Sequence, residues 1–181
     1  MTRCFISLAL PDTLIREISE LQKTVTKKLE HEMKGFKASF TPVENLHITL
    51  KFLGEINKET VAEVEKRLQK INFAAFGVRL GKCGVFSPRI PRILWIELHG
   101  AEKLQQEIDR VLLGLFAVEA QFMGHITLAR IKYIPTKEAF NEYISGLSGS
   151  AEGRVKEFSL QKSTLSADRA VYETLETYYL K

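Results

Sequence analysis

The chain has few of the residues that build metal sites and disulfide frameworks. Only two of its 181 residues are cysteines, Cys4 and Cys83, and their separation does not match the close ligand spacing of a zinc site. Two cysteines also give no disulfide framework of the kind found in small secreted domains, so we expect a cytoplasmic protein. We interpret both as small buried hydrophobic residues, and we expect neither a metal nor a cofactor.

Long apolar runs and a strong charge of one sign are also missing. The apolar run from Cys4 to Leu10 stops at Pro11, far short of the ~20 residues that span a bilayer, and has no signal-peptide cleavage pattern. We therefore expect no membrane association. The net charge of +4 is mild, which suits an anionic ligand but is weaker than the charge of a dedicated nucleic-acid coat. The 45% of hydrophobic residues is ordinary for a soluble globular protein.

Histidine is scarce as well, and this makes one repeat informative. The chain has four histidines, and two of them begin the same tetrapeptide, His-Ile-Thr-Leu, at His47 and at His125. At average residue frequencies, the expected chance count of such a repeat is on the order of one in a thousand. We therefore interpret the repeat as a functional pair. The other two, His31 and His99, lie outside any such pattern, and we expect them near a helix end and a strand end.

Apolar spacing predicts the same structural context for both copies of the tetrapeptide. In the first half, we expect a strand over Arg3–Leu10 and then a helix that opens at Pro11-Asp12 and carries its apolar stripe over Leu14–Leu29. A motif strand over Leu46–Leu53 follows, and then a second helix that Asn57 caps and that carries apolar positions over Val61–Ile71. In the second half, the same order is expected over Ile93–Leu98, Leu104–Leu115, Gln121–Ile131 and Ala139–Ile144. Further strands are expected over Ala74–Phe86, Val155–Leu165 and Ala170–Leu180, and a flexible loop over Gly146–Gly153. This pattern predicts two pseudo-equivalent lobes that share one cleft within a single domain, residues 1–181.

Strand geometry brings an imidazole and a hydroxyl together in each copy. In an extended strand, residues i and i+2 point the same way, about 6.5–7 Å apart. His47 therefore shares a face with Thr49, and His125 with Thr127. Approximate two-fold symmetry would turn the two pairs toward each other across the cleft.

The same alternation makes two further predictions. It places Lys51 on the face of His47 and puts Phe52 on the opposite face. It also puts Arg130 on the face opposite His125, so Arg130 needs a bulge or a long reach to enter the cleft. Arg130 remains a candidate because its guanidinium could make a charge-assisted contact to phosphate.

Two imidazoles that face each other suit an in-line displacement at phosphorus. One can remove a proton from water while the other donates a proton to the departing oxygen, because an ordinary imidazole pKa of about 6.5 allows both states at neutral pH. The two threonine hydroxyls can hydrogen-bond the non-bridging phosphoryl oxygens, where negative charge accumulates. The residues alone do not say which histidine is the acid and which is the base.

The paired His-x-Thr-x motifs and their flanking sequence carry a family resemblance. They resemble the two-histidine (2H) phosphoesterase superfamily, and within it the RNA 2′,3′-cyclic phosphodiesterases, also called 2′-5′ RNA ligases. The resemblance covers essentially the whole chain, in the segments Asn45–Gly54, Gly84–Phe86, Ile93–Trp95, His125–Arg130, Lys162–Leu165 and Val171–Glu173. Gly124 departs from the pattern, since such proteins commonly carry proline or alanine before the second histidine, and we expect it to loosen the backbone there.

This resemblance implies a fold, a reaction and a set of roles. The fold would be α+β, with two lobes that are each an antiparallel sheet with helices packed outside, around a central cleft. The reaction would be metal-independent hydrolysis of RNA 2′,3′-cyclic phosphate ends to 2′-phosphomonoesters, with weak reverse 2′-5′ ligation. His47 would be the proton donor and His125 the proton acceptor, and Thr49, Thr127 and Arg130 would bind substrate. The implied partner is an RNA or oligonucleotide end, transfer-RNA fragments included, and we expect a monomer.

Two alternatives stay open at this point. The cleft could hold an RNA end without catalysis, or the enzyme could act on another small cyclic phosphate. Phe52, Phe86 and Trp95 could stack a base, although aromatic residues in strands are more often core. The basic loop Ser87–Arg92 could steer RNA, although an ordinary solvated loop is at least as good an interpretation.

Overall fold

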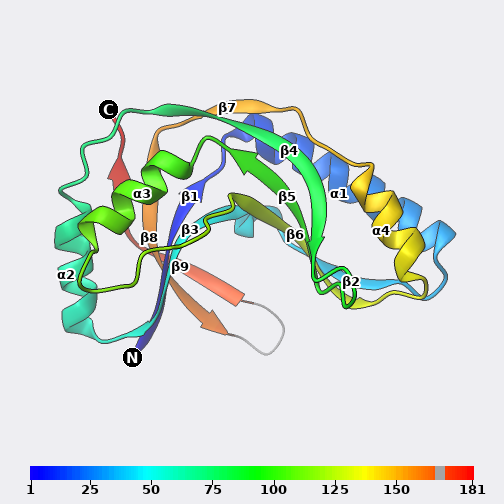
Figure 1. Cartoon of the computed structure of the whole chain (residues 1–181), viewed down its shortest axis with the longest axis horizontal. Helices are drawn as coiled ribbons and strands as arrows, with labels where there is room; N and C mark the ends of the chain where they lie inside the picture. Colours follow the sequence, from blue (N-terminus) through cyan, green and yellow to red (C-terminus); the bar gives the residue numbers. More distant parts are fainter. Residues whose placement is uncertain (166–169) are drawn as a thin grey trace.

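A computed structural model describes residues 1–165 and 170–181 of the chain (Figure 1). Within these described residues, nine strands form one sheet, in the order β7-β4-β5-β6-β3-β1-β8-β9, and β2 pairs with β6 off this path. The strands are β1 Thr2–Ala9, β2 Lys37–Phe40, β3 His47–Ile56, β4 Phe76–Phe86, β5 Ile93–His99, β6 His125–Tyr133, β7 Glu152–Val155, β8 Glu157–Leu165 and β9 Ala170–Tyr179. The helices are α1 Asp12–Glu32, α2 Lys58–Leu68, α3 Glu102–Val111 and α4 Lys137–Ser145, with a 3₁₀ turn at Val43–Asn45.

The predicted internal repeat is present in the element order. The series β1, α1, β3, α2 in the first half is matched by β5, α3, β6, α4 in the second. In Figure 1, α2 and α3 lie at one side of the curled sheet, and α1 and α4 lie at the other. The α3 helix packs on β3, α4 on β4, and α1 on β7. The predicted α+β class, with antiparallel strands and helices outside them, is confirmed.

The two halves join in one continuous sheet. Strands β3 and β6 pair antiparallel, with Ile48 opposite Ile126, so the second residues of the two tetrapeptides face each other across the junction. Both isoleucines are fully buried. This pairing satisfies backbone groups that would otherwise form two open sheet edges. It also brings the two motifs to the middle of the molecule.

Apolar side chains beneath the helices form the core, as their spacing predicted. The stripe of α1, which includes Leu14, Ile18, Val25 and Leu29, is buried. Asn57 caps α2 as expected, because its side-chain oxygen accepts a hydrogen bond of 2.8 Å from the Thr60 amide.

The two cysteines are buried, as predicted. Cys4 and Cys83 are both free thiols within the core. Burial raises the pKa of Cys83 to about 12, so its thiol stays protonated at neutral pH.

Several of the expected limits of helices and strands were wrong, and one strand was missed. The strand β2 was missed, because its four residues, Lys37–Phe40, are too few to show a period. The second motif strand begins at His125 and not at Gln121. The end of the loop expected over Gly146–Gly153 belongs to β7, Glu152–Val155, which pairs with β4. Pairing with a distant strand, which local sequence does not encode, fixes each of these limits.

Candidate active site

Each motif strand carries a bulge directly after its tetrapeptide. Along β3, the pairing with β1 passes from Thr49 to Lys51, so Leu50 has no partner. Along β6, the pairing with β5 passes from Thr127 to Ala129, and Leu128 is skipped in the same way. Two successive residues are therefore buried in each strand, and the alternation of faces restarts one residue later.

These bulges decide which side chains reach the cleft. Lys51 was predicted to share the face of His47, and this was wrong: Lys51 is only 5% exposed, and Phe52 faces the cleft instead. Arg130 was expected to need a bulge or a long reach, and the bulge in β6 returns it to the face of His125. The guanidinium of Arg3 lies 4.9 Å from the centre of the Phe52 ring, which places a second cation on the first motif's side.

A cavity of about 310 Å³ joins the two motifs. His47, Thr49, His125 and Thr127 all line it, as the strand geometry predicted, and Arg130 lines it too. The remaining lining residues are Arg3, Phe5, Ser39, Phe40, Thr41, Pro42, Asn45, Phe52, Ser163, Ala170 and Tyr172. Two imidazoles, two hydroxyls and a guanidinium therefore converge on one space of the size that binds a small ligand.

The two imidazoles are held in the same way. Nδ1 of His47 donates a hydrogen bond of 2.8 Å to the carbonyl of Asn45, and Nδ1 of His125 donates one of 2.9 Å to the carbonyl of Met123. Because a carbonyl only accepts, both rings carry a proton on Nδ1. Nε2 is then the nitrogen that gains or loses a proton in each ring. Thr49 Oγ1 lies 3.3 Å from Nε2 of His47, so hydroxyl and imidazole can act on the same group of ligand atoms.

Aromatic side chains restrict both imidazoles. The His47 ring lies 5.2 Å from Phe5 and 5.2 Å from Tyr172, and the His125 ring meets Phe86 edge-on at 4.9 Å, measured between ring centres. Trp95 packs against Phe86, with ring centres 5.6 Å apart. Phe86 and Trp95 therefore support the second motif as packing residues, while Phe52 lines the cavity.

Burial lowers the pKa of His47 below its ordinary value. The hydrogen bond to the Asn45 carbonyl opposes this shift, and the charge of His125 adds to it. The protonated form of His47 is therefore a stronger acid than a solvated imidazolium.

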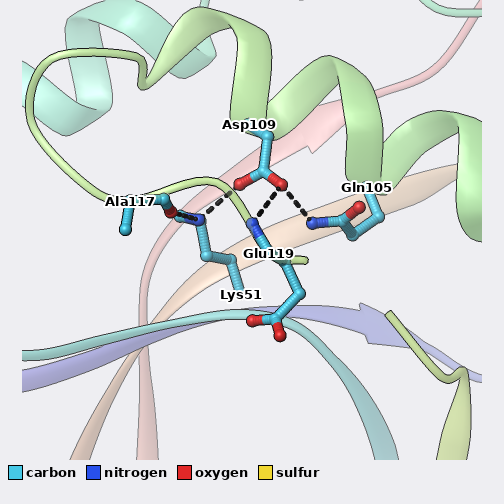
Figure 2. Close-up of polar contacts among 5 residues, drawn as sticks. All are labelled: Lys51, Gln105, Asp109, Ala117 and Glu119. Carbon is cyan, nitrogen blue, oxygen red and sulfur yellow. Dashed lines mark hydrogen bonds and ion pairs between the residues drawn. The ribbon is translucent and has the colours of Figure 1, made fainter. Parts of the chain in front are cut away.

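A buried ion pair connects the first motif strand to the segment that leads to the second (Figure 2). Nζ of Lys51 donates to Oδ1 of Asp109 and to the carbonyl of Ala117, the latter at 2.6 Å. Oδ2 of Asp109 accepts from Gln105 Nε2 at 2.7 Å and from the Glu119 amide at 2.9 Å. Burial raises the pKa of Asp109, but these hydrogen bonds outweigh burial and hold its pKa below the ordinary value. The network thus ties β3 to α3 and to the chain that precedes His125.

Gly124 allows the close approach that starts β6. The amide of Leu98 donates to the Gly124 carbonyl at 2.9 Å, and a Cβ at position 124 would lie 2.3 Å from the Leu98 carbonyl oxygen. The expectation that Gly124 loosens the backbone was therefore wrong: its missing side chain lets β5 and the start of β6 pack tightly.

Sequence reasoning missed several residues of this site. Phe5 and Tyr172 flank His47 from β1 and β9, which lie far from the first motif in the sequence. Val171–Glu173 resembled the family sequence, but no local signal marked Tyr172 as a neighbour of His47. His31 and His99 lie at a helix end and a strand end, as expected, and line neither motif.

Two properties hold for the part of the chain that the structure describes. None of its helices is both long enough and apolar enough to span a bilayer. No group of three or more histidine, cysteine, aspartate or glutamate side chains gathers within residues 1–165 and 170–181 as a metal site would require.

The curled antiparallel sheet carries one histidine motif on each of its two adjoining central strands. This combination of fold and site is that of a class of phosphoesterases. The family model described as LigT-like phosphoesterase matches residues 8–95 and 98–172. The chain belongs to this family, which confirms the resemblance inferred from the motifs.

Relatives and solved structures agree with this assignment. The chain is 29% identical over 182 residues to an RNA 2′,3′-cyclic phosphodiesterase of Methanocaldococcus jannaschii, a match that covers 97% of this chain and 99% of the relative. It is 31% identical to the protein of that name from Archaeoglobus fulgidus, over 97% of this chain and 99% of the relative. The crystal structure of TT0787 of Thermus thermophilus matches with a TM-score of 0.78 and 25% identity, over 98% of this chain and 97% of that one. The crystal structure of Escherichia coli LigT complexed with 3′-AMP matches with a TM-score of 0.69 and 22% identity, over 99% of this chain and 98% of that one.

Proposed function

We propose that this protein hydrolyses the 2′,3′-cyclic phosphate at RNA ends to a 2′-phosphomonoester, without a metal ion. The observation that supports it most is the matched pair of imidazoles, each with Nδ1 hydrogen-bonded to a backbone carbonyl, in one cavity that Thr49 and Thr127 also line. A site that only bound an RNA end would need no second proton carrier. The relatives named RNA 2′,3′-cyclic phosphodiesterases support the same substrate.

In the proposed reaction, the cyclic phosphate sits between the two motifs. His125 removes a proton from water with its neutral Nε2, and that water attacks phosphorus. The bond from phosphorus to the 3′ oxygen breaks on the opposite side, and the protonated Nε2 of His47 donates a proton to that oxygen. The low pKa of His47 makes it a ready donor, and the anionic phosphate stabilises its protonated form while substrate is bound.

The other cavity residues would stabilise the charge on phosphorus. Thr49 and Thr127 are placed to donate hydrogen bonds to the non-bridging oxygens, and Arg130 offers a charge-assisted contact from the second motif's side. Each of these interactions would strengthen as negative charge accumulates in the transition state. The same path, with the 5′-hydroxyl of a second RNA end attacking phosphorus in place of water, would form a 2′-5′ phosphodiester and free the 3′-hydroxyl, which is weak 2′-5′ ligation.

The test is to incubate the protein with an oligonucleotide that ends in a 2′,3′-cyclic phosphate, in the presence of EDTA. We expect full turnover and a 2′-phosphate product, because the proposed steps use only imidazole, hydroxyl and guanidinium groups. The product is identified by ³¹P NMR. A 3′-phosphate product would mean that the wrong leaving oxygen is assigned, and activity lost to EDTA and restored by a divalent ion would contradict the metal-independent mechanism.

A further inference from the structure

A buried polar side chain of α1 anchors the segment that leads into the first motif. The Gln22 amide donates to the carbonyl of Thr41 at 3.0 Å and to the carbonyl of Leu128 at 2.9 Å. The Thr41 amide donates to the same Leu128 carbonyl at 2.9 Å. Leu128 ends the second tetrapeptide and is the residue that the bulge in β6 leaves without a partner on β5. The chain before His47 is therefore fastened to the strand that carries His125.

The buried ion pair makes the reciprocal connection for the second motif. Lys51 directly follows the bulge residue of β3, and its ammonium donates to the carbonyl of Ala117 at 2.6 Å. Its partner on α3, Asp109, accepts a hydrogen bond of 2.9 Å from the Glu119 amide. The chain before His125 is therefore fastened to the strand that carries the first motif.

The two anchors lie at the same distance along the chain from their histidines. Thr41 comes six residues before His47, and Glu119 comes six residues before His125. In each case the carbonyl that accepts the hydrogen bond from the imidazole Nδ1 belongs to the residue four positions after the anchored one. One anchor is a neutral amide and the other is an ion pair, so the two halves hold the same point of the chain by different chemistry.

Stability alone does not account for polar groups at these positions. The inner face of α1 is otherwise apolar, and Gln22 lies between the buried Ile18 and Val25. An apolar side chain there would pack without the cost of burying an amide. Replacing a buried ion pair such as Lys51 and Asp109 by well-packed apolar residues is likewise often neutral or stabilising. What the polar groups add is a directed hold on one particular stretch of backbone.

We propose that Gln22 and the pair of Lys51 and Asp109 are positioning residues, each fixing the imidazole of the motif whose preceding chain it anchors. The anchor sets the place of the backbone carbonyl, the carbonyl keeps a proton on Nδ1, and Nε2 is left to exchange a proton with substrate. Because each anchor joins the chain before one motif to the strand of the other, His47 and His125 are fixed only when the two halves are docked together. The effect on catalysis rests on the proposed function.

The test reads the imidazole tautomers by ¹⁵N NMR without substrate, at about pH 8.5, where an ordinary imidazole is neutral. The nitrogen shifts of each ring show which nitrogen carries the proton, and in the unaltered protein we expect Nδ1 in both His47 and His125. Gln22→Leu should turn the His47 ring into a mixture of tautomers and leave His125 unchanged. Lys51→Met combined with Asp109→Leu, which buries no isolated charge, should do the reverse.

The same variants distinguish positioning from substrate binding. In each, kcat on a 2′,3′-cyclic phosphate should fall by about 10- to 100-fold, because a displaced acid or base transfers its proton less well. KM should change far less, since the contacts to the phosphate remain. Gln22→Met, which keeps the length of the side chain, replaces Gln22→Leu if that variant does not fold. Asp109→Asn, which keeps the shape of its side chain, is the corresponding second variant for the other anchor.

The control is Gln106→Leu, the same chemical change on the exposed face of α3, which should alter neither the tautomers nor kcat. Rings that both keep the proton on Nδ1 in the anchor variants would overturn the proposal, because the anchors would then be structural only. An equal change in His47 and His125 in each variant would also overturn it, because that is a general loosening of the fold. If the unaltered protein hydrolysed no cyclic phosphate, the proposed function would fail, and the tautomers would still decide whether the anchors position the rings.

Discussion

Replacing His47 or His125 by alanine is expected to lower kcat on a 2′,3′-cyclic phosphate by about 10²–10⁴, the usual contribution of one positioned acid or base. In the proposed reaction, each imidazole exchanges its Nε2 proton on one side of the phosphorus, so neither can replace the other. The measurement is steady-state kinetics on each variant, with His31→Ala as the control. His31 lies at the end of α1 and does not line the motif cavity.

The double variant distinguishes a cooperating pair from two independent groups. We expect His47→Ala combined with His125→Ala to lose much less than the product of the two single losses, because one proton transfer is of little use without the other. Alanine at Thr49 or Thr127 should cost less, about the effect of one hydrogen bond to developing charge. Unchanged kcat in either single histidine variant would refute the two-proton mechanism.

Replacing Lys51 by methionine is expected to destabilise the protein by about 3–5 kcal/mol, because it leaves the buried carboxylate of Asp109 without its cation. Lys51 and Asp109 are only 4% and 6% exposed at their side chains, so water does not screen the loss. The free energy of unfolding is measured with urea at pH 7. Lys66→Met on the exposed face of α2 is the matched control and should change stability by less than about 0.5 kcal/mol.

Two further measurements identify the unpaired charge as the cause. The penalty of Lys51→Met should shrink as the pH is lowered toward about 4, because a protonated Asp109 is no longer an unpaired anion. Combining Lys51→Met with Asp109→Leu should restore part of the loss, since the double variant buries no isolated charge. A penalty that is independent of pH and fully additive in the double variant would show that lost packing, and not charge, is responsible.

The sequence predicted strands and helices correctly where the periodic pattern of apolar and polar residues continued without a break. The alternation through His-Ile-Thr-Leu predicted both motif strands and the shared face of each histidine and threonine. The apolar stripe of α1 and the Asn57 cap of α2 were predicted for the same reason, since both depend on residues within a few positions of one another.

Features that depend on two distant segments could not be predicted in this way. The bulges that bury Lys51 and return Arg130 to the cleft arise from how β3 and β6 pair with β1 and β5. Asp109 lies 58 residues from Lys51 and was not marked by any motif. Tyr172 reaches His47 from the last strand of the sheet. Each of these contacts follows from tertiary pairing, which one sequence does not reveal.

NMR titration of the four histidine rings, with and without a nucleoside 2′-monophosphate, tests most directly whether the two motifs form one phosphate site. Without ligand, His47 should titrate below the ordinary value of about 6.5, because burial disfavours its charged form. With ligand, the phosphate charge should raise the pKa of His47 and shift the ring signals of His125, while the signals of His31 and His99 stay in place. Ring signals of His47 and His125 that respond to the nucleotide no more than those of His31 and His99 would contradict the account.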